Sequence, residues 1–150
     1  MDETPDLPRI VSLSADELSA LFMLLGSSQA LSNVLQAARG EWVDLFHCCW
    51  TAPQRSAADH EAELRSAVAA PWEQFSERLR QHRHREYLRI GLADLVGRYS
   101  VQTTMAELSA LAAGSFAAAY QWARHCMVAQ CGELQIGDRS PQRPVVPAED

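Results

Sequence analysis

Apolar residues in the first third of the chain recur three and four positions apart, which is the spacing of one face of an α-helix. The first such stripe lies in residues 14–26 and consists of Leu18, Leu21, Phe22 and Leu25. Ser14 and Glu17 precede it in the arrangement of a capping box. Similar stripes predict helices over residues 27–40 and 41–50, and Pro53 ends the second of these.

The longest helical pattern follows Pro71 and runs to Gly97. Its first half is rich in arginine, whereas residues 87–96 are apolar on almost every side. A helix that is charged at one end and apolar all round at the other is exposed at the first and buried at the second. We therefore predict a central helix whose C-terminal half lies between neighbouring helices.

A final helix is predicted over residues 104–132. Thr104 and Glu107 have the spacing of a second capping box, and Gly132 supplies a C-terminal stop. The predicted inner stripe of this helix consists of Leu108, Leu111, Ser115, Ala118, Trp122 and Cys126. Small residues on both sides of Gly114 predict a close approach of this helix to the central one.

No segment alternates apolar and polar residues as a half-buried strand does. The pattern therefore predicts an all-α fold, an irregular bundle of five or six helices in a single domain over residues 14–132. Residues 1–13 are predicted to be a disordered N-terminal lead. Residues 133–150 contain three prolines and no periodicity, and they are predicted to be a Pro-rich tail.

The charge of the chain limits the classes of function. A net charge of −6 argues against a general nucleic-acid binder. All 13 basic residues are arginine, since the sequence contains no lysine, and this excludes lysine Schiff bases and a phosphate-loop lysine. Residues 1–77 carry four arginines against twelve acidic residues, and we expect this acidic part to pair with the arginine-rich central helix.

Cysteine usage and the start of the sequence favour the cytoplasm. Two of the four cysteines, Cys48 and Cys49, are adjacent, and adjacent cysteines rarely form a disulfide with each other. The acidic first residues lack the apolar run of a secretory signal, and no apolar segment is long enough to span a bilayer. We therefore expect a reduced, cytoplasmic protein.

The sequence contains no recognisable catalytic or metal-binding pattern. No glycine-rich phosphate loop or nucleophile elbow is present, and His82 and His84 cannot share a helical face as a metal-binding pair. The carboxylates have structural interpretations: Asp94 pairs with Arg98 one turn later, and Glu107 caps its helix. The predicted aromatic core anchors are Trp72, Tyr120 and Trp122. We therefore predict no catalytic residue and no metal site.

The most prominent chemical feature is an arginine-rich face of the central helix, on which Arg85 and Arg89 lie one turn apart. One interpretation is a solvated face whose like charges are partly offset by Glu86. The other is a contact surface for an anionic partner, either a phosphate group or an acidic protein. Arg85 and Arg89 are therefore the candidate contact residues for an anion or a partner.

Three stretches carry information beyond their periodicity. The first is GSSQAL at residues 26–31, with GEWVDL at residues 40–45. The second is LRQHRHREYLRIGLADLVG at residues 79–97, and the third is ELSALA at residues 107–112. In this order they resemble the family of glutamine synthetase adenylyltransferases and adenylyl-removing enzymes. The second stretch is the most specific of the three.

Three positions depart from the usual pattern of that family. Gly40 stands in place of a proline, His82 in place of an aromatic residue, and Ala113 in place of an acidic residue. The resemblance implies helices that precede a nucleotidyltransferase core, in enzymes that control nitrogen assimilation. One half of such an enzyme attaches AMP from ATP to glutamine synthetase, and the other half removes it by phosphorolysis.

In that family the core contains a Gly-Lys-Leu-Gly-Gly stretch and an Asp-x-Asp motif, whose carboxylates hold the magnesium ions that bridge nucleotide phosphates. The present sequence contains neither motif, and Pro147 follows residues 143–146, about where the first strand of the core should start. The resemblance therefore implies a helical leader without its catalytic core: a truncated, non-catalytic fragment or remnant. The family uses ATP and magnesium, but this chain is expected to bind no cofactor itself.

The implied partners are a nucleotidyltransferase core and, through it, glutamine synthetase, with no membrane or nucleic-acid partner. The alternative is a free-standing helical interaction module that binds a protein through the arginine-rich face. If the central helix normally packs against a core, the isolated chain is expected to expose an apolar patch and to self-associate or be partly molten.

Overall fold

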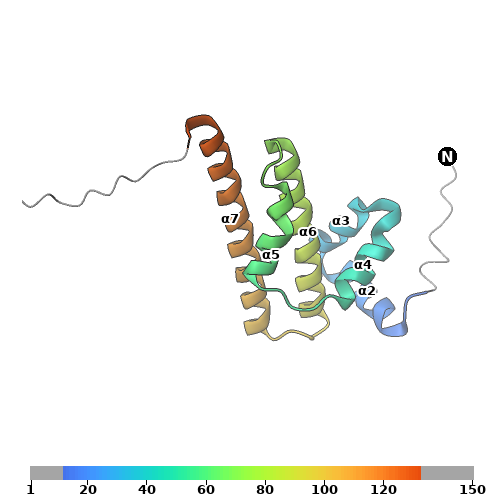
Figure 1. Cartoon of the computed structure of the whole chain (residues 1–150). Coiled ribbons are helices and arrows are strands. Elements are labelled where there is room, and N and C mark those ends of the chain that lie inside the picture. Colours follow the sequence, from blue (N-terminus) through green and yellow to red (C-terminus); the bar gives the residue numbers. More distant parts are fainter. Residues whose placement is uncertain (1–11, 133–150) are drawn as a thin grey trace, which may run out of the picture.

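The structure is a computed structural model, and it describes residues 12–132. The described chain contains α-helices, two short 3₁₀-helices and no strand, which confirms the predicted all-α bundle (Figure 1). The α-helices are α2 (Ala15–Ser27), α3 (Gln29–Ala37), α4 (Trp42–Thr51), α5 (Ala57–Leu64), α6 (Trp72–Leu95) and α7 (Val101–Cys131). The 3₁₀-helices are η1 (Arg39–Glu41) and η2 (Arg65–Ala67). The predicted tail and most of the predicted lead lie outside the described residues.

Serine side chains begin four of the described helices. Ser14 and Ser56 each form a capping box with the acidic residue three positions later. Ser28 and Ser100 accept a hydrogen bond from the backbone amide three positions later, at the starts of α3 and α7. These caps satisfy amide groups that have no partner within the helix. The predicted box at Ser14 is thereby confirmed.

α7 begins three residues earlier than the sequence predicts. The predicted capping box of Thr104 and Glu107 is wrong, because Ser100 already caps the helix. The hydroxyl of Thr104 instead donates a hydrogen bond to Asp94 at 2.7 Å. Glu107 therefore lies inside the helix, where its side chain is buried.

Arg98 connects the turn after α6 to α4. Its guanidinium donates a hydrogen bond to the carbonyl oxygen of Trp50 at 2.7 Å and lies 4.3 Å from the centre of the Trp50 ring. This is the geometry of a cation–π contact. The predicted pairing of Arg98 with Asp94 is therefore wrong, since a partner distant in sequence holds the guanidinium and Thr104 binds the carboxylate.

α6 runs through the middle of the fold and contacts two groups of helices (Figure 1). Its C-terminal half packs with α2, α3 and α4 in a core that includes Leu24, Phe46, Leu88 and Leu92. Its N-terminal half packs with α5 and α7 around a smaller cluster of Leu64, Phe75 and Ala118. The predicted central helix is confirmed, and its charged half is also partly buried.

The buried face of α2 differs from the predicted stripe. Phe22 is 70% exposed, and the buried residues are Glu17, Ala20, Leu21 and Leu24. Glu17 points inward because its carboxylate binds the hydroxyl of Ser14 and lies 2.6 Å from Nδ1 of His47 on α4. This contact fixes the buried stripe at the positions three, four and seven residues after Glu17.

The small residues of α7 allow a close approach, but the helix approached at Gly114 is α5. A Cβ added at Gly114 would lie 2.5 Å from the carbonyl oxygen of Ala57 and 2.6 Å from the Cβ of His60. The sequence prediction, which placed this contact on the central helix, is therefore wrong. The prediction fails because the apolar pattern of α5 is weak, so the sequence did not indicate α5 as a packing partner of α7.

The aromatic residues of α7 have different environments. Trp122 stacks on Phe75 with 5.6 Å between ring centres, and its indole N–H donates to the carbonyl oxygen of Ala70 at 3.0 Å. This confirms Trp122 as a core anchor. Trp72 touches the Trp122 ring but is 53% exposed. The prediction for Tyr120 is wrong, because Tyr120 lies on the outer face of α7, which no described helix covers.

Candidate functional site

Three arginines and three glutamates meet where α5, α6, α7 and the loop after α4 come together. We call this group the charged cluster, and its members are Arg55, Glu63, Arg85, Glu86, Arg89 and Glu107. Each arginine of the cluster forms ion pairs with two of the glutamates. The formal charges cancel, which offsets the large cost of removing charged groups from water.

Arg89 is the most enclosed arginine of the charged cluster, with a side chain that is 2% exposed. Its Nε donates to Glu86 at 2.7 Å, and its Nη2 donates to Glu107 at 2.5 Å. Its Nη1 donates to the backbone oxygen of Pro53 and to the hydroxyl of Tyr99, both at 3.2 Å. The rigid fork of donors thus joins α6 to α7, to the loop after α4 and to the turn before α7.

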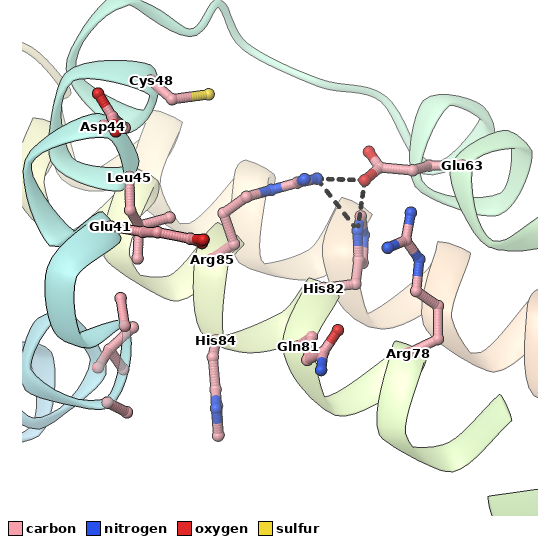
Figure 2. Close-up of a pocket in the computed structure, with 13 residues that line it drawn as sticks. Glu41, Asp44, Leu45, Cys48, Glu63, Arg78, Gln81, His82, His84 and Arg85 are labelled. Atoms are coloured by element: carbon pink, nitrogen blue, oxygen red, sulfur yellow. Dashed lines mark hydrogen bonds and ion pairs between the residues drawn. The ribbon is translucent and has the colours of Figure 1, made fainter. Parts of the chain in front are cut away.

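Arg55 extends the charged cluster toward the surface. Its Nη1 lies 2.6 Å from a carboxylate oxygen of Glu63 and 2.9 Å from one of Glu86. Its backbone N–H donates to Glu107 at 3.2 Å, so the same loop residue contacts three helices, α5, α6 and α7. Arg85 also pairs with Glu63, at the outer edge, where the Arg85 side chain is 34% exposed (Figure 2).

Ion pairing outweighs burial in setting the charge of the glutamates. Burial alone raises the pKa of Glu63, but hydrogen bonds from Arg85 and Arg55 lower it to about 2. Burial likewise raises the pKa of Glu86, and the hydrogen bond and charge of Arg89 lower it below its usual value. Both carboxylates are therefore ionised at neutral pH.

Acid is expected to destabilise the fold through Glu63. Because its pKa is about 2 in the folded protein and 4.5 ordinarily, its contribution to stability is complete above about pH 4.5 and is lost as the pH falls toward about 2. Melting temperatures from about pH 6 to about pH 2 measure this loss. The Glu63→Gln variant should show a flatter profile over that window.

Glu77→Gln is the matched control, since Glu77 pairs with Arg80 on the surface of α6, outside the charged cluster. Its profile should follow that of the wild type. The buried histidines act in the same direction below about pH 6.5, so the contribution of Glu63 is the difference between wild type and Glu63→Gln. Full acid sensitivity in Glu63→Gln would contradict the prediction.

Two buried histidines adjoin the charged cluster. His60 is fully buried, and its Nδ1 lies 3.1 Å from Nε2 of His82. On its other side, Nδ1 of His82 lies 3.4 Å from a carboxylate oxygen of Glu63. Burial is the main cause that lowers the pKa of both histidines. The pair is therefore neutral at pH 7, and one ring donates to the other.

Glu63, His82 and Glu86 bring ligand atoms within 4.8 Å of one another, which is close enough to suggest a metal site. Both carboxylates already bind guanidinium groups, Glu63 that of Arg85 and Glu86 that of Arg55. A metal cation would lie beside these arginines and would have to displace them. The arrangement therefore fits internal ion pairing better than metal binding.

A cleft of about 780 Å³ opens beside the charged cluster (Figure 2). Arg78, His84 and Arg85 line it from α6, and Glu41 and Asp44 line it from η1 and α4. The cleft thus presents positive and negative side chains to whatever enters it. Arg85 belongs to both features, because it lines the cleft and pairs with Glu63 in the charged cluster.

The structure separates the two residues that the sequence proposes as anion or partner contacts. Arg89 uses its donors on groups within the fold, whereas Arg85 reaches the cleft. Contact of either residue with an anion or a partner stays a prediction, and the geometry favours Arg85. The sequence analysis assigned Glu86 the role of partly offsetting the like charges of Arg85 and Arg89. In the structure Glu86 forms ion pairs with both arginines.

Sequence reasoning missed Arg55, Glu63 and the inward position of Glu107. A usable signal existed for Glu107, because it begins the buried stripe that continues with Leu111, Gly114 and Ala118. A charged residue on a buried stripe requires a buried partner of opposite charge. Arg55 precedes α5 in a loop, where no periodicity indicates which way a side chain points.

The fold and the charged cluster define a class of protein: an all-α helical domain in which the most enclosed arginine connects the domain's own helices. The sequence model described as glutamate-ammonia ligase adenylyltransferase matches residues 18–146. The chain belongs to this family. No curated protein and no solved structure matches it. Within residues 12–132 no single helix is long and apolar enough to cross a membrane; α2 and α3 meet that criterion only as a pair bent by 115°.

Proposed function

We propose that this chain is the non-catalytic helical leader of a glutamate-ammonia ligase adenylyltransferase and that it binds a nucleotidyltransferase core. The observation that carries the proposal is the family match over residues 18–146, on a sequence without a Gly-Lys-Leu-Gly-Gly stretch or an Asp-x-Asp motif. Through the core, the chain takes part in the transfer of AMP to glutamine synthetase or in the removal of AMP from it. This activity is in the cytoplasm. ATP and magnesium bind to the core.

The charged cluster supports a scaffold role. Arg89 and Arg55 connect α5, α6, α7 and the loop after α4 through hydrogen bonds and ion pairs, beside the cleft. Arg85 stands at the edge of this cleft with a guanidinium that reaches solvent. Such a group recognises a carboxylate or phosphate by paired hydrogen bonds. We place the contact with the core, or with its nucleotide, at Arg85.

Binding of the purified chain to a separately expressed nucleotidyltransferase core of the family tests the proposal. Size-exclusion light scattering should show a complex, and the melting temperature should rise, because a partner that binds only the folded state stabilises it. Alone, the chain should show no AMP transfer to glutamine synthetase and no phosphorolytic removal. Transfer by the chain alone would contradict the non-catalytic role, and a failure to bind any family core would contradict the leader role.

Reversing the charge at Arg85 is expected to weaken core binding about tenfold or more, since a like charge facing the partner is repulsive. Isothermal titration with the core measures the dissociation constant of Arg85→Glu against the wild type. Arg85→Gln, which removes the charge without reversing it, should fall between them. Arg80→Glu is the matched control, because Arg80 lies on the same helix but is absent from the cleft walls. Equal affinities for Arg85→Glu and the wild type would exclude Arg85 from the contact.

A second candidate function is that of a free-standing module that binds an acidic protein. Two arginines on one wall of the cleft, Arg78 and Arg85, favour it. The binding experiment with the core distinguishes this candidate from the first proposal. Here the chain would be stable alone and would not bind the core. Capture of an acidic partner would then depend on Arg85, and capture that survives Arg85→Glu would contradict this candidate.

A further inference from the structure

The outer face of α7 carries an apolar stripe that no described residue covers. α7 lies at an edge of the bundle in Figure 1. Its buried residues contact the neighbouring helices: Gly114 meets α5, and Glu107 binds Arg89 of α6. The exposed stripe consists of Val101, Met105, Leu108, Phe116, Tyr120 and Met127. At about 100° per residue these positions share one side of the helix, nearly opposite the buried stripe. No charged residue lies among them.

The area of the stripe approaches that of one half of a stable protein–protein interface. With Phe116 77% exposed, the six side chains together present roughly 700 Å² of surface, taking about 150–250 Å² for a large side chain. The largest apolar patch on a typical monomer is about 300–600 Å². A stable interface buries about 800 Å² on each partner.

We infer that this stripe is an interface with a second copy of the chain, in which two α7 helices cross antiparallel about a two-fold axis at Phe116. Phe116 is the midpoint of α7, which runs from residue 101 to residue 131. Reversal of the helix about this point sets Met105 opposite Met127 of the second copy. It also sets Ala112 opposite Tyr120, so that a large side chain meets a small one, and it sets Leu108 opposite Arg124 at the margin of the stripe.

The stripe thus matches its own reverse at Met105, Phe116 and Met127, as a two-fold interface requires, since the same surface must serve both copies. A groove of about 540 Å³ between α6 and α7 continues the stripe, and Leu79, Tyr87 and Leu108 line it. The side chain that flanks it, Arg83, lies over the ring of Tyr87 at 5.5 Å. The edge of the second α7 fits along this groove, and contacts of this kind depend little on salt.

The mass of the purified chain in size-exclusion light scattering tests the inference. A dimer of twice 16.6 kDa is expected, at about 0.05 M and about 1 M salt alike, because screening weakens only charged contacts. Phe116→Glu places two carboxylates at the axis and should raise the dimer dissociation constant about a hundredfold or more. Phe22→Glu is the matched control: Phe22 on α2 is also exposed, and this variant should stay dimeric. Circular dichroism verifies that both variants are folded.

Cross-linking tests the antiparallel crossing. In a background with Cys48, Cys126 and Cys131 replaced by serine, Phe116→Cys should form a disulfide between copies on oxidation, because the two-fold axis brings the thiols together. The equivalent Phe22→Cys variant should not. A monomer at every concentration, a dimer that survives Phe116→Glu, or an absent cross-link would overturn the inference. If an added core dissociates the dimer, the stripe binds the core, and the dimer inference is overturned as well. If the chain fails to bind the core but remains a dimer, only the proposed function fails, and the dimer inference stands.

Discussion

Replacing Arg89 with methionine is expected to lower the free energy of unfolding by about 3–5 kcal/mol. The substitution leaves Glu86 and Glu107 buried without the guanidinium that binds both of them. It also removes the donors that hold the backbone of Pro53 and the hydroxyl of Tyr99. Denaturation by urea, followed by circular dichroism, measures the change.

Arg83→Met is the matched control for Arg89→Met. Arg83 lies on the same helix, but its guanidinium is over the exposed ring of Tyr87, and the substitution should change stability by less than about 0.5 kcal/mol. Arg89→Met combined with Glu107→Leu should cost less than the sum of the two single substitutions, because the pair is then removed together. A loss below about 1 kcal/mol for Arg89→Met would show that the charged cluster does not hold the helices.

Arg89 lies in residues 79–97, the stretch that most specifically resembles the adenylyltransferase family. Residues 79–97 supply three of the six members of the charged cluster, Arg85, Glu86 and Arg89. Their side chains connect α6 to α5, to α7 and to the loop after α4. The arginines of this segment therefore have a structural explanation, and Arg85 alone of the two candidates is also placed to meet a partner.

The fold class and most helix positions follow from short-range features of the sequence. The serine cap at Ser14, the break near Pro53 and the stop at Gly132 each act within a few residues, so they are visible without a structure. The buried C-terminal half of α6 follows from its apolar composition on every side. These predictions succeed because the local pattern and the tertiary contacts agree.

The predictions that fail involve contacts between residues distant in sequence. Glu107 fits a capping box locally, but an arginine 18 residues away binds it inside the fold. The His60–His82 contact joins residues that are 22 apart, and no periodicity relates them. α5 has one large apolar residue, Leu64, so its place against α6 and α7 also depends on the charged cluster and on the close approach at Gly114. Neither feature can be read from the local pattern.

Gly114→Val is expected to lower the free energy of unfolding by about 1–3 kcal/mol or more through overpacking. The added Cβ would lie 2.5 Å from the carbonyl oxygen of Ala57, and backbone atoms cannot move aside without moving the helix. α5 would have to shift away from α7, which would pull His60 from His82 and strain the amide of Arg55 against Glu107. Thermal unfolding measures the loss.

Two alanine substitutions, Gly114→Ala and Gly26→Ala, test whether α5 and α7 are as close at Gly114 as the structure places them. Helix propensity alone makes Gly→Ala favourable by about 1 kcal/mol inside a helix. Gly26→Ala should show a gain of this sign, because a Cβ at Gly26 meets nothing within 4 Å. Gly114→Ala should instead destabilise, since the overlap with Ala57 and His60 exceeds the gain in propensity. If both variants raise the melting temperature, the two helices are farther apart than the structure places them, and the position of α5 then rests on Leu64, the His60–His82 contact and the charged cluster.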